Sequence, residues 1–96
     1  MEPRISVRKG KVSDETKDYI EKACDKFDRY FDRIVACEVV LDRQKQGHAV
    51  EFVLKVPHQT LTASAASDNL YRAVDEVQGK MEAQLKKYHD KKISHR

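Results

Sequence analysis

The residues best suited to bind a ligand are Lys and Arg residues that recur at helical spacing. The first set, which we call the first basic row, has steps of four, three and four residues: Lys22, Lys26, Arg29 and Arg33. At about 100° per residue, this spacing places the row on one face of a helix. Acidic residues follow the same spacing on another face: Asp14, Asp18, Glu21, Asp25, Asp28 and Asp32. Separated rows of opposite charge create a field across the helix that suits a charged partner.

A similar row occurs near the C-terminus. The second basic row consists of Lys80, Gln84, Lys87 and Lys91. Lys86 and Lys92 lie near it in sequence, and only Glu82 and Asp90 offset these positive charges. Polyphosphate chains are the natural ligand for two cationic rows, because each contact releases a counterion. The residues alone therefore predict binding of structured RNA or another polyanion.

Four further residues are secondary candidates for RNA contact. Arg8 and Lys9 belong to a basic N-terminal segment, and Lys92 follows the second basic row. Tyr30 borders the first basic row, where its ring could stack on a base. The alternative for this ring is a place at the edge of the core, with its hydroxyl group in water.

Three other interpretations of the charges remain open. The pairs Asp18–Lys22 and Asp25–Arg29 have the i,i+4 spacing of stabilising ion pairs on a solvated helix. Cations near the end of the last helix also interact favourably with its dipole. The chain could instead be a regulatory adaptor that binds another protein through the acidic face of the first helix.

Catalysis has little support in the sequence. The chain has three glycines and no glycine-rich phosphate loop, and it lacks HExxH and CxxC ligand pairs. The four histidines fall at expected turns or in the tail. We predict no enzyme activity, no metal site, no cofactor and no small-molecule substrate. Cys24 and Cys37 fall on apolar faces, so we expect buried free thiols.

Composition indicates a small folded protein. The chain has 96 residues, 36% of them charged and 40% hydrophobic, which is enough for one domain with its own core. The net charge of +3 is concentrated at the two ends of the chain. No apolar run approaches the roughly 20 residues of a membrane span, and the N-terminus does not resemble a signal peptide. We therefore expect a cytoplasmic protein without a membrane partner.

Hydrophobic periodicity predicts six elements. Alternation predicts strands around residues 5–7, 37–42, 50–56 and 60–65, with a turn at residues 57–59. A helix over about residues 14–31 begins after Ser13, and its apolar stripe reaches Ile34. A last helix begins after Ser67 or Asp68 and carries an apolar stripe from Leu70 to Tyr88.

The predicted fold is α+β with the order β-α-β-β-β-α. Each strand has one apolar face and each helix one apolar stripe, so both helices should pack on one face of a four-stranded sheet. We expect a single domain over residues 1–96, with a flexible tail from about residue 91.

Three segments resemble a known family. They are residues 26–34 (KFDRYFDRI), residues 39–41 (VVL) and residues 67–91, which contain the pattern D-x-L-Y-x-A-V-D followed by K-x-x-x-Q-L-x-K-Y. These motifs are similar to those of the ribosome hibernation-promoting factors, also called ribosome-associated inhibitors or sigma-factor modulation proteins. The similarity spans nearly the whole chain.

The resemblance implies a fold similar to double-stranded-RNA-binding domains. It also implies binding to the small ribosomal subunit near the decoding centre, where the protein blocks messenger and transfer RNA in stress or stationary phase. The implied partners are 16S rRNA and neighbouring ribosomal proteins, and the free protein is expected to be monomeric. The residues that match the family's rRNA-facing positions are Lys22, Lys26, Lys80, Gln84, Lys87 and Lys91.

Two positions depart from the family pattern. Ala83 stands where the family often has arginine, and His89 where it often has lysine, so the basic surface of the last helix is thinner than usual. The chain also lacks an acidic tail or an added dimerisation domain. It therefore resembles the short class that promotes pairing of idle ribosomes.

Overall fold

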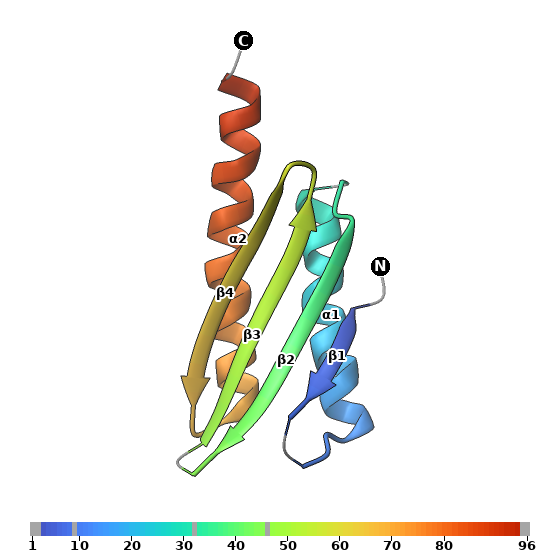
Figure 1. The fold of residues 1–96 in the computed structure, drawn as a ribbon, viewed down its shortest axis with the longest axis vertical. Helices are drawn as coiled ribbons and strands as arrows, with labels where there is room; N and C mark the ends of the chain where they lie inside the picture. Colours follow the sequence, from blue (N-terminus) through green and yellow to red (C-terminus); the bar gives the residue numbers. More distant parts are fainter. Residues whose placement is uncertain (1–2, 9, 32, 46, 95–96) are drawn as a thin grey trace.

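The structure, a computed structural model, describes residues 3–8, 10–31, 33–45 and 47–94. Six elements follow one another: β1 (Arg4–Val7), α1 (Asp14–Tyr30), β2 (Ala36–Gln44), β3 (Gly47–Val56), β4 (Gln59–Ser67) and α2 (Leu70–Ser94). Figure 1 shows the strands in one layer and both helices in a second layer behind them. This arrangement confirms the predicted α+β class and the order β-α-β-β-β-α. The likeness to double-stranded-RNA-binding domains stays a prediction.

The sheet is mixed, with the strand order β1-β2-β3-β4. β1 is parallel to β2, and the other two neighbouring pairs are antiparallel. Because a tight turn cannot join parallel strands, the chain crosses over through α1 between β1 and β2. β1, β2 and β4 therefore run in the same direction, and α1 and α2 start at the same end of the sheet (Figure 1).

The strands are longer than their apolar alternation predicted. The prediction that the second strand stops before Arg43 is wrong, because Arg43 and Gln44 pair with His48 and Gly47 in the β2–β3 ladder. β4 likewise extends to Ser67, which pairs with His48. Pairing of backbone groups across the sheet extends these strands beyond their apolar residues.

The core lies between the sheet and the two helices. Ile20 and Phe27 of α1, Met81 of α2, and Phe52 and Leu54 of β3 are all fully buried. Alternate residues of each long strand point into this layer, as the period of two requires. No helix in the described part of the chain combines the length and the apolar character needed to cross a membrane.

α1 begins where the sequence predicts but ends earlier. The Ser13 hydroxyl accepts a hydrogen bond from the Thr16 backbone N–H at 3.2 Å, which confirms the predicted cap. The helix ends at Tyr30, and Phe31 turns to an extended conformation while its side chain stays buried. Arg33 and Ile34 therefore lie in the loop before β2, so the prediction that helical spacing places them on stripes of α1 is wrong.

α2 is capped by Asn69 rather than by Ser67 or Asp68, which corrects the prediction. The Asn69 side-chain oxygen accepts hydrogen bonds from the N–H groups of Tyr71 at 3.0 Å and Arg72 at 3.4 Å. The cap lies later than predicted because β4 still includes Ser67. At its other end, α2 continues through Ser94. Residues 95 and 96 lie outside the described residues, and flexibility of this end stays a prediction.

Aromatic residues join the two helices along their length. The rings of Tyr19 and Tyr71 meet edge to face at 4.8 Å, and those of Phe31 and Tyr88 at 5.3 Å. The Tyr19 hydroxyl donates a hydrogen bond to the Asp75 carboxylate. This hydrogen bond, with smaller contributions from burial and nearby charge, raises the pKa of Tyr19. The contacts hold α1 and α2 side by side.

The two cysteines are buried free thiols, as predicted. Cys24 of α1 and Cys37 of β2 lie with their sulfur atoms 3.2 Å apart. The hydrogen bond with Cys37 and burial in the core raise the pKa of Cys24. A thiol held in its neutral form reacts slowly, which suits a packing role.

Two glycines should respond in opposite ways to alanine. A Cβ atom added at Gly79 would meet no heavy atom within 4 Å, so Gly79→Ala should raise the free energy of unfolding by about 1 kcal/mol. A Cβ atom at Gly47 would lie 2.5 Å from the Ser67 carbonyl oxygen, and the φ of Gly47 is +149°. Gly47→Ala should therefore lower the free energy of unfolding by about 2 kcal/mol or more. Urea denaturation measures both changes, and a loss of stability in Gly79→Ala would contradict the packing described for α2.

Candidate nucleic-acid interface

Three members of the first basic row lie exposed on the outer surface of α1: Lys22, Lys26 and Arg29. Their direction follows from Tyr19, whose contacts with Tyr71 and Asp75 show which side of α1 faces α2. Lys22 and Lys26 follow Tyr19 by three and seven residues, so they lie within about 60° of it around the helix axis. The first basic row therefore borders the junction with α2.

The acidic face of α1 lies on the side of the helix that is turned away from α2. Glu21 and Asp25 follow Tyr19 by two and six residues, which places them about 160° and 120° from it. Both side chains are exposed. The field across α1 therefore runs from a positive side next to α2 to a negative side away from it.

The expected ion pairs on α1 do not form. In the part of the chain that the structure describes, neither Asp18–Lys22 nor Asp25–Arg29 brings charged atoms within 4 Å, whereas Lys55 and Glu38 do so on the sheet, at 4.0 Å. Exposed pairs of this kind contribute little in any case. The cations of the first basic row are therefore available to an external anion.

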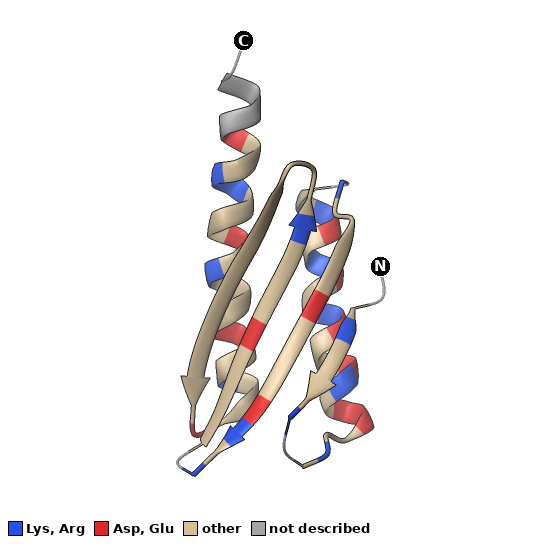
Figure 2. Cartoon of the chain, in the orientation of Figure 1, with Lys and Arg blue, Asp and Glu red and all other residues tan. Residues whose placement is uncertain are grey.

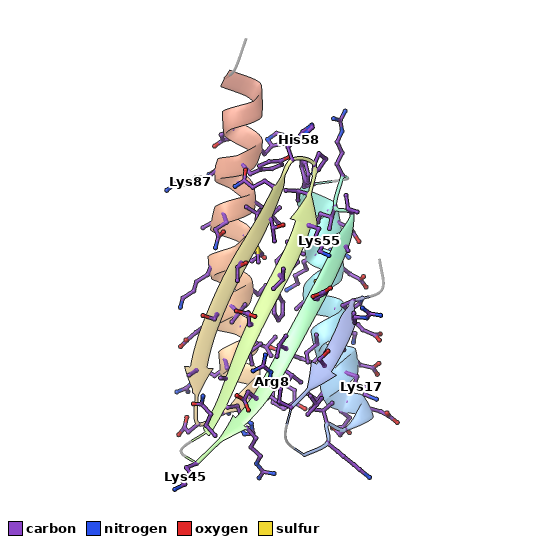
Figure 3. The ribbon with its side chains drawn as sticks, in the orientation of Figure 1. Arg8, Lys17, Lys45, Lys55, His58 and Lys87 are labelled. Atoms are coloured by element: carbon purple, nitrogen blue, oxygen red, sulfur yellow. The ribbon has the colours of Figure 1, made fainter. Side chains whose placement is uncertain are left out.

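The second basic row lies on the flank of α2 next to β4. Lys80 donates a hydrogen bond from Nζ to the Ser64 carbonyl oxygen at 2.9 Å, and Gln84 donates one from Nε2 to the Thr62 carbonyl oxygen at 2.7 Å. Lys87 is exposed, and Figure 3 shows it projecting outward from α2, away from the strands. Residues of both elements line an open groove there: Gln59, Leu61, Gln84, Lys87 and Tyr88.

Lys86 lies on a different face of α2 from the second basic row. It lines a hollow on α2 together with Gly79, Glu82, Ala83, Leu85, His89 and Asp90. Ala83 and His89, the positions where the resemblance implies arginine and lysine, both lie in this hollow. The His89 ring is 6.2 Å from the Phe31 ring, centre to centre, in an edge-to-face contact. The positive charge of Lys86 therefore lies in the same hollow as Ala83 and His89.

The two basic rows are brought to the same layer and the same end of the molecule. α1 and α2 start together, so the lysines and arginines in their C-terminal halves lie near the other end (Figure 2). The two rows do not form one stripe, because the second row faces β4 while the first faces α2. Gly79 and Ala83 lie on the surface of α2 between the two rows. Both are exposed, and neither has a side chain larger than a methyl group.

The structure separates the remaining candidates from these rows or leaves them undescribed. Ile5 and Val7 pack toward the core, so Arg8 lies on the open face of the sheet, in a hollow that also contains Asp42 and Glu51. Arg33 is exposed in the loop after α1. Lys9 lies outside the described residues, as do the side chains of Tyr30, Lys91 and Lys92.

Among the described residues, no group of three or more His, Cys, Asp or Glu side chains lies close enough together to hold a metal ion.

The sequence analysis did not identify the backbone groups of Thr62 and Ser64, which lie beside the second basic row. The available signal was the composition of the strand from Gln59 to Ser67, which contains no charged residue.

Comparison with known proteins matches this architecture and these sequence motifs. Residues 4–93 match the family described as Sigma 54 modulation protein / S30EA ribosomal protein. The chain belongs to this family. A ribosome hibernation promoting factor of Azotobacter vinelandii is 31% identical over 93 residues, covering 97% of this chain and 87% of that protein. One of Escherichia coli is 30% identical over 95 residues, covering 99% and 100%.

A solved structure has the same fold. The ribosomal subunit interface protein from Coxiella burnetii superposes with a TM-score of 0.87 at 27% sequence identity, covering 94% of this chain and 99% of that one. Family membership therefore agrees with the resemblance expected from the three sequence segments.

The contacts with β4 predict different stabilities for neighbouring variants of α2. Gln84 is half-buried and bonded to a strand carbonyl, so Gln84→Ala should lower the free energy of unfolding by about 1 kcal/mol. Lys80→Ala should cost less, because Lys80 is exposed. Lys87→Ala should leave stability unchanged within about 0.5 kcal/mol. Urea denaturation of the three variants tests this order, and an unchanged Gln84→Ala would show that its bond to β4 contributes nothing.

Proposed function

We propose that this protein is a ribosome hibernation factor that binds the small ribosomal subunit near the decoding centre. Bound there, it blocks messenger and transfer RNA and inhibits translation in stress or stationary phase. The proposal is supported mainly by one observation: a member of this family carries two cationic rows, free of close ion pairs among the described residues, on one helical layer. The mechanism is steric occlusion and involves no catalytic step.

Affinity and specificity have different physical sources in this proposal. Lysine and arginine contacts with 16S rRNA phosphates supply most of the affinity, since each contact releases a counterion. Specificity comes from the shape of the surface, because phosphate contacts carry no sequence information. The aromatic contacts between α1 and α2 keep that shape fixed. In this proposal the protein is a cytoplasmic monomer before it binds. Once it associates with a ribosome, it also touches neighbouring ribosomal proteins.

Charge reversal tests whether the helix layer binds the ribosome. Lys26→Glu combined with Lys87→Glu should abolish sedimentation with ribosomes on sucrose gradients of stationary-phase extract, because one cation is reversed in each row. Arg43→Glu combined with Lys45→Glu is the matched control, with the same change in net charge at exposed positions next to the β2–β3 turn. The control should sediment with ribosomes. Equal loss in both variants would reduce the effect to net charge alone.

Salt dependence tests the source of the affinity. If about five to eight phosphates are contacted, the logarithm of the binding constant for purified small subunits should fall with the logarithm of salt concentration at a slope of about −4 to −7. Lys22→Gln or Lys87→Gln should each reduce the magnitude of this slope by about one. Filter binding across a salt series measures both slopes. A slope near zero would rule out phosphate contacts as the main source of affinity.

Competition distinguishes this proposal from the two alternatives. Binding to small subunits should survive an excess of unrelated structured RNA, whereas a general RNA-binding module would be displaced. A regulatory adaptor that used the acidic face of α1 would lose its protein partner in Asp25→Lys and keep it in Lys87→Glu. Ribosome binding should show the opposite response to these two substitutions.

A further inference from the structure

β4 is an edge strand whose outer backbone groups face away from the sheet. The Val35 N–H donates to the Lys55 carbonyl oxygen at 2.7 Å, so the backbone groups of Lys55 face β2. Backbone groups alternate along a strand, so those of Val56 face β4, and its partner Gln59 faces back toward β3. Counting onward in steps of two, the outward-facing residues of β4 are Thr60, Thr62, Ser64 and Ala66.

This edge lacks the usual features that keep an edge strand from binding other chains. Edge strands are commonly short or carry charges or proline. β4 is nine residues long, from Gln59 to Ser67, and contains no charged residue and no proline. Instead, Lys80 and Gln84 of α2 reach over it and bond to its carbonyl groups.

These two hydrogen bonds change the chemical character of the edge. An open strand edge presents donors and acceptors in alternation, and its carbonyl oxygens repel an anion. Here Lys80 and Gln84 already occupy the outward carbonyl oxygens of Ser64 and Thr62. The outward N–H groups of Thr62 and Ser64 have no acceptor within the described part of the chain, and both side chains are exposed. Between Thr62 and Ser64 the edge therefore presents two N–H donors, and the hydroxyl groups of both residues lie beside them on the open face of the sheet.

The donors lie next to a cationic groove. Gln84 both bonds to Thr62 and lines the groove that contains Lys87. Backbone N–H groups and Ser or Thr hydroxyls are common partners of phosphate and sugar oxygens in nucleic-acid complexes. A strand that places a phosphate against Lys87 would therefore have further donors along its path on β4.

We propose that the β4 edge is part of the RNA-binding surface, with the Thr62 and Ser64 N–H and hydroxyl groups donating to phosphate or sugar oxygens of an rRNA strand. This strand lies along the outer edge of β4, between the groove that contains Lys87 and the open face of the sheet. The assignment rests on the proposed function and extends it from side-chain cations to a neutral backbone edge. Lys80 and Gln84 then act as positioning residues as well as contacts, since they remove the repulsive carbonyl oxygens from the path of the strand.

Thr62→Pro tests the role of the edge. Proline removes the outward N–H and the hydroxyl group of residue 62 while leaving the ladder with β3 intact, and edge strands tolerate it. Binding to purified small subunits should weaken about tenfold at moderate salt, as loss of hydrogen bonds to a charged group predicts. The salt slope should stay unchanged, because a neutral donor releases no counterion. Lys87→Gln is the matched comparison and should reduce the slope by about one.

A second variant covers the case in which the proline disturbs folding. Thr62→Val combined with Ser64→Ala removes both hydroxyl groups and keeps the backbone, and it should weaken binding severalfold with an unchanged slope. Wild-type affinity in folded Thr62→Pro, or in the double variant, would overturn the assignment of the edge. Wild-type protein that fails to bind small subunits would overturn the proposed function itself, so the two failures are distinguishable.

Discussion

Burial of one apolar stripe from each helix against one face of the sheet is the constraint on which the charged surface depends. Phe27 and Met81 are fully buried beneath the two helices. Rotating α1 to turn its first basic row inward would expose Phe27, at a cost of about 2 to 3 kcal/mol, and would bury ammonium or guanidinium groups at a larger cost. The directions of Lys22 and Lys26 are thus set by the packing of their apolar neighbours.

Topology then decides where along the molecule the cations gather. Because β1 and β4 run in the same direction, the helices that follow them start at one end of the sheet and finish at the other. The basic residues of both helices occur mainly in the C-terminal halves, so a parallel arrangement brings the two rows to one end. An antiparallel pair of helices would have separated them. Cations near helix C-termini also interact favourably with the helix dipoles, so the arrangement does not oppose folding.

Local periodicity was enough to predict the element order, the core and the Ser13 cap, since each depends on neighbours in sequence. The failures lie where a distant segment decides. α1 ends at Tyr30 because Phe31 turns into the core, which leaves Arg33 in a loop although its spacing fits the first basic row. Asn69 caps α2 because pairing with β3 extends β4 to Ser67. The bonds from Lys80 and Gln84 to β4 depend on how α2 lies beside the edge, which no local pattern contains.

Those bonds also show that structural and binding roles need not exclude each other on the second basic row. An ammonium group has three donors and a side-chain amide has two, so Lys80 and Gln84 each keep a donor after bonding to β4. The bonds to Ser64 and Thr62 restrict side chains that would otherwise lose rotamer freedom on binding. A restricted side chain has less conformational entropy left to lose when an anion binds. Residues that cover the sheet edge in the free protein are therefore already placed for a ligand, whereas Lys87, which projects into solvent, must be ordered by it.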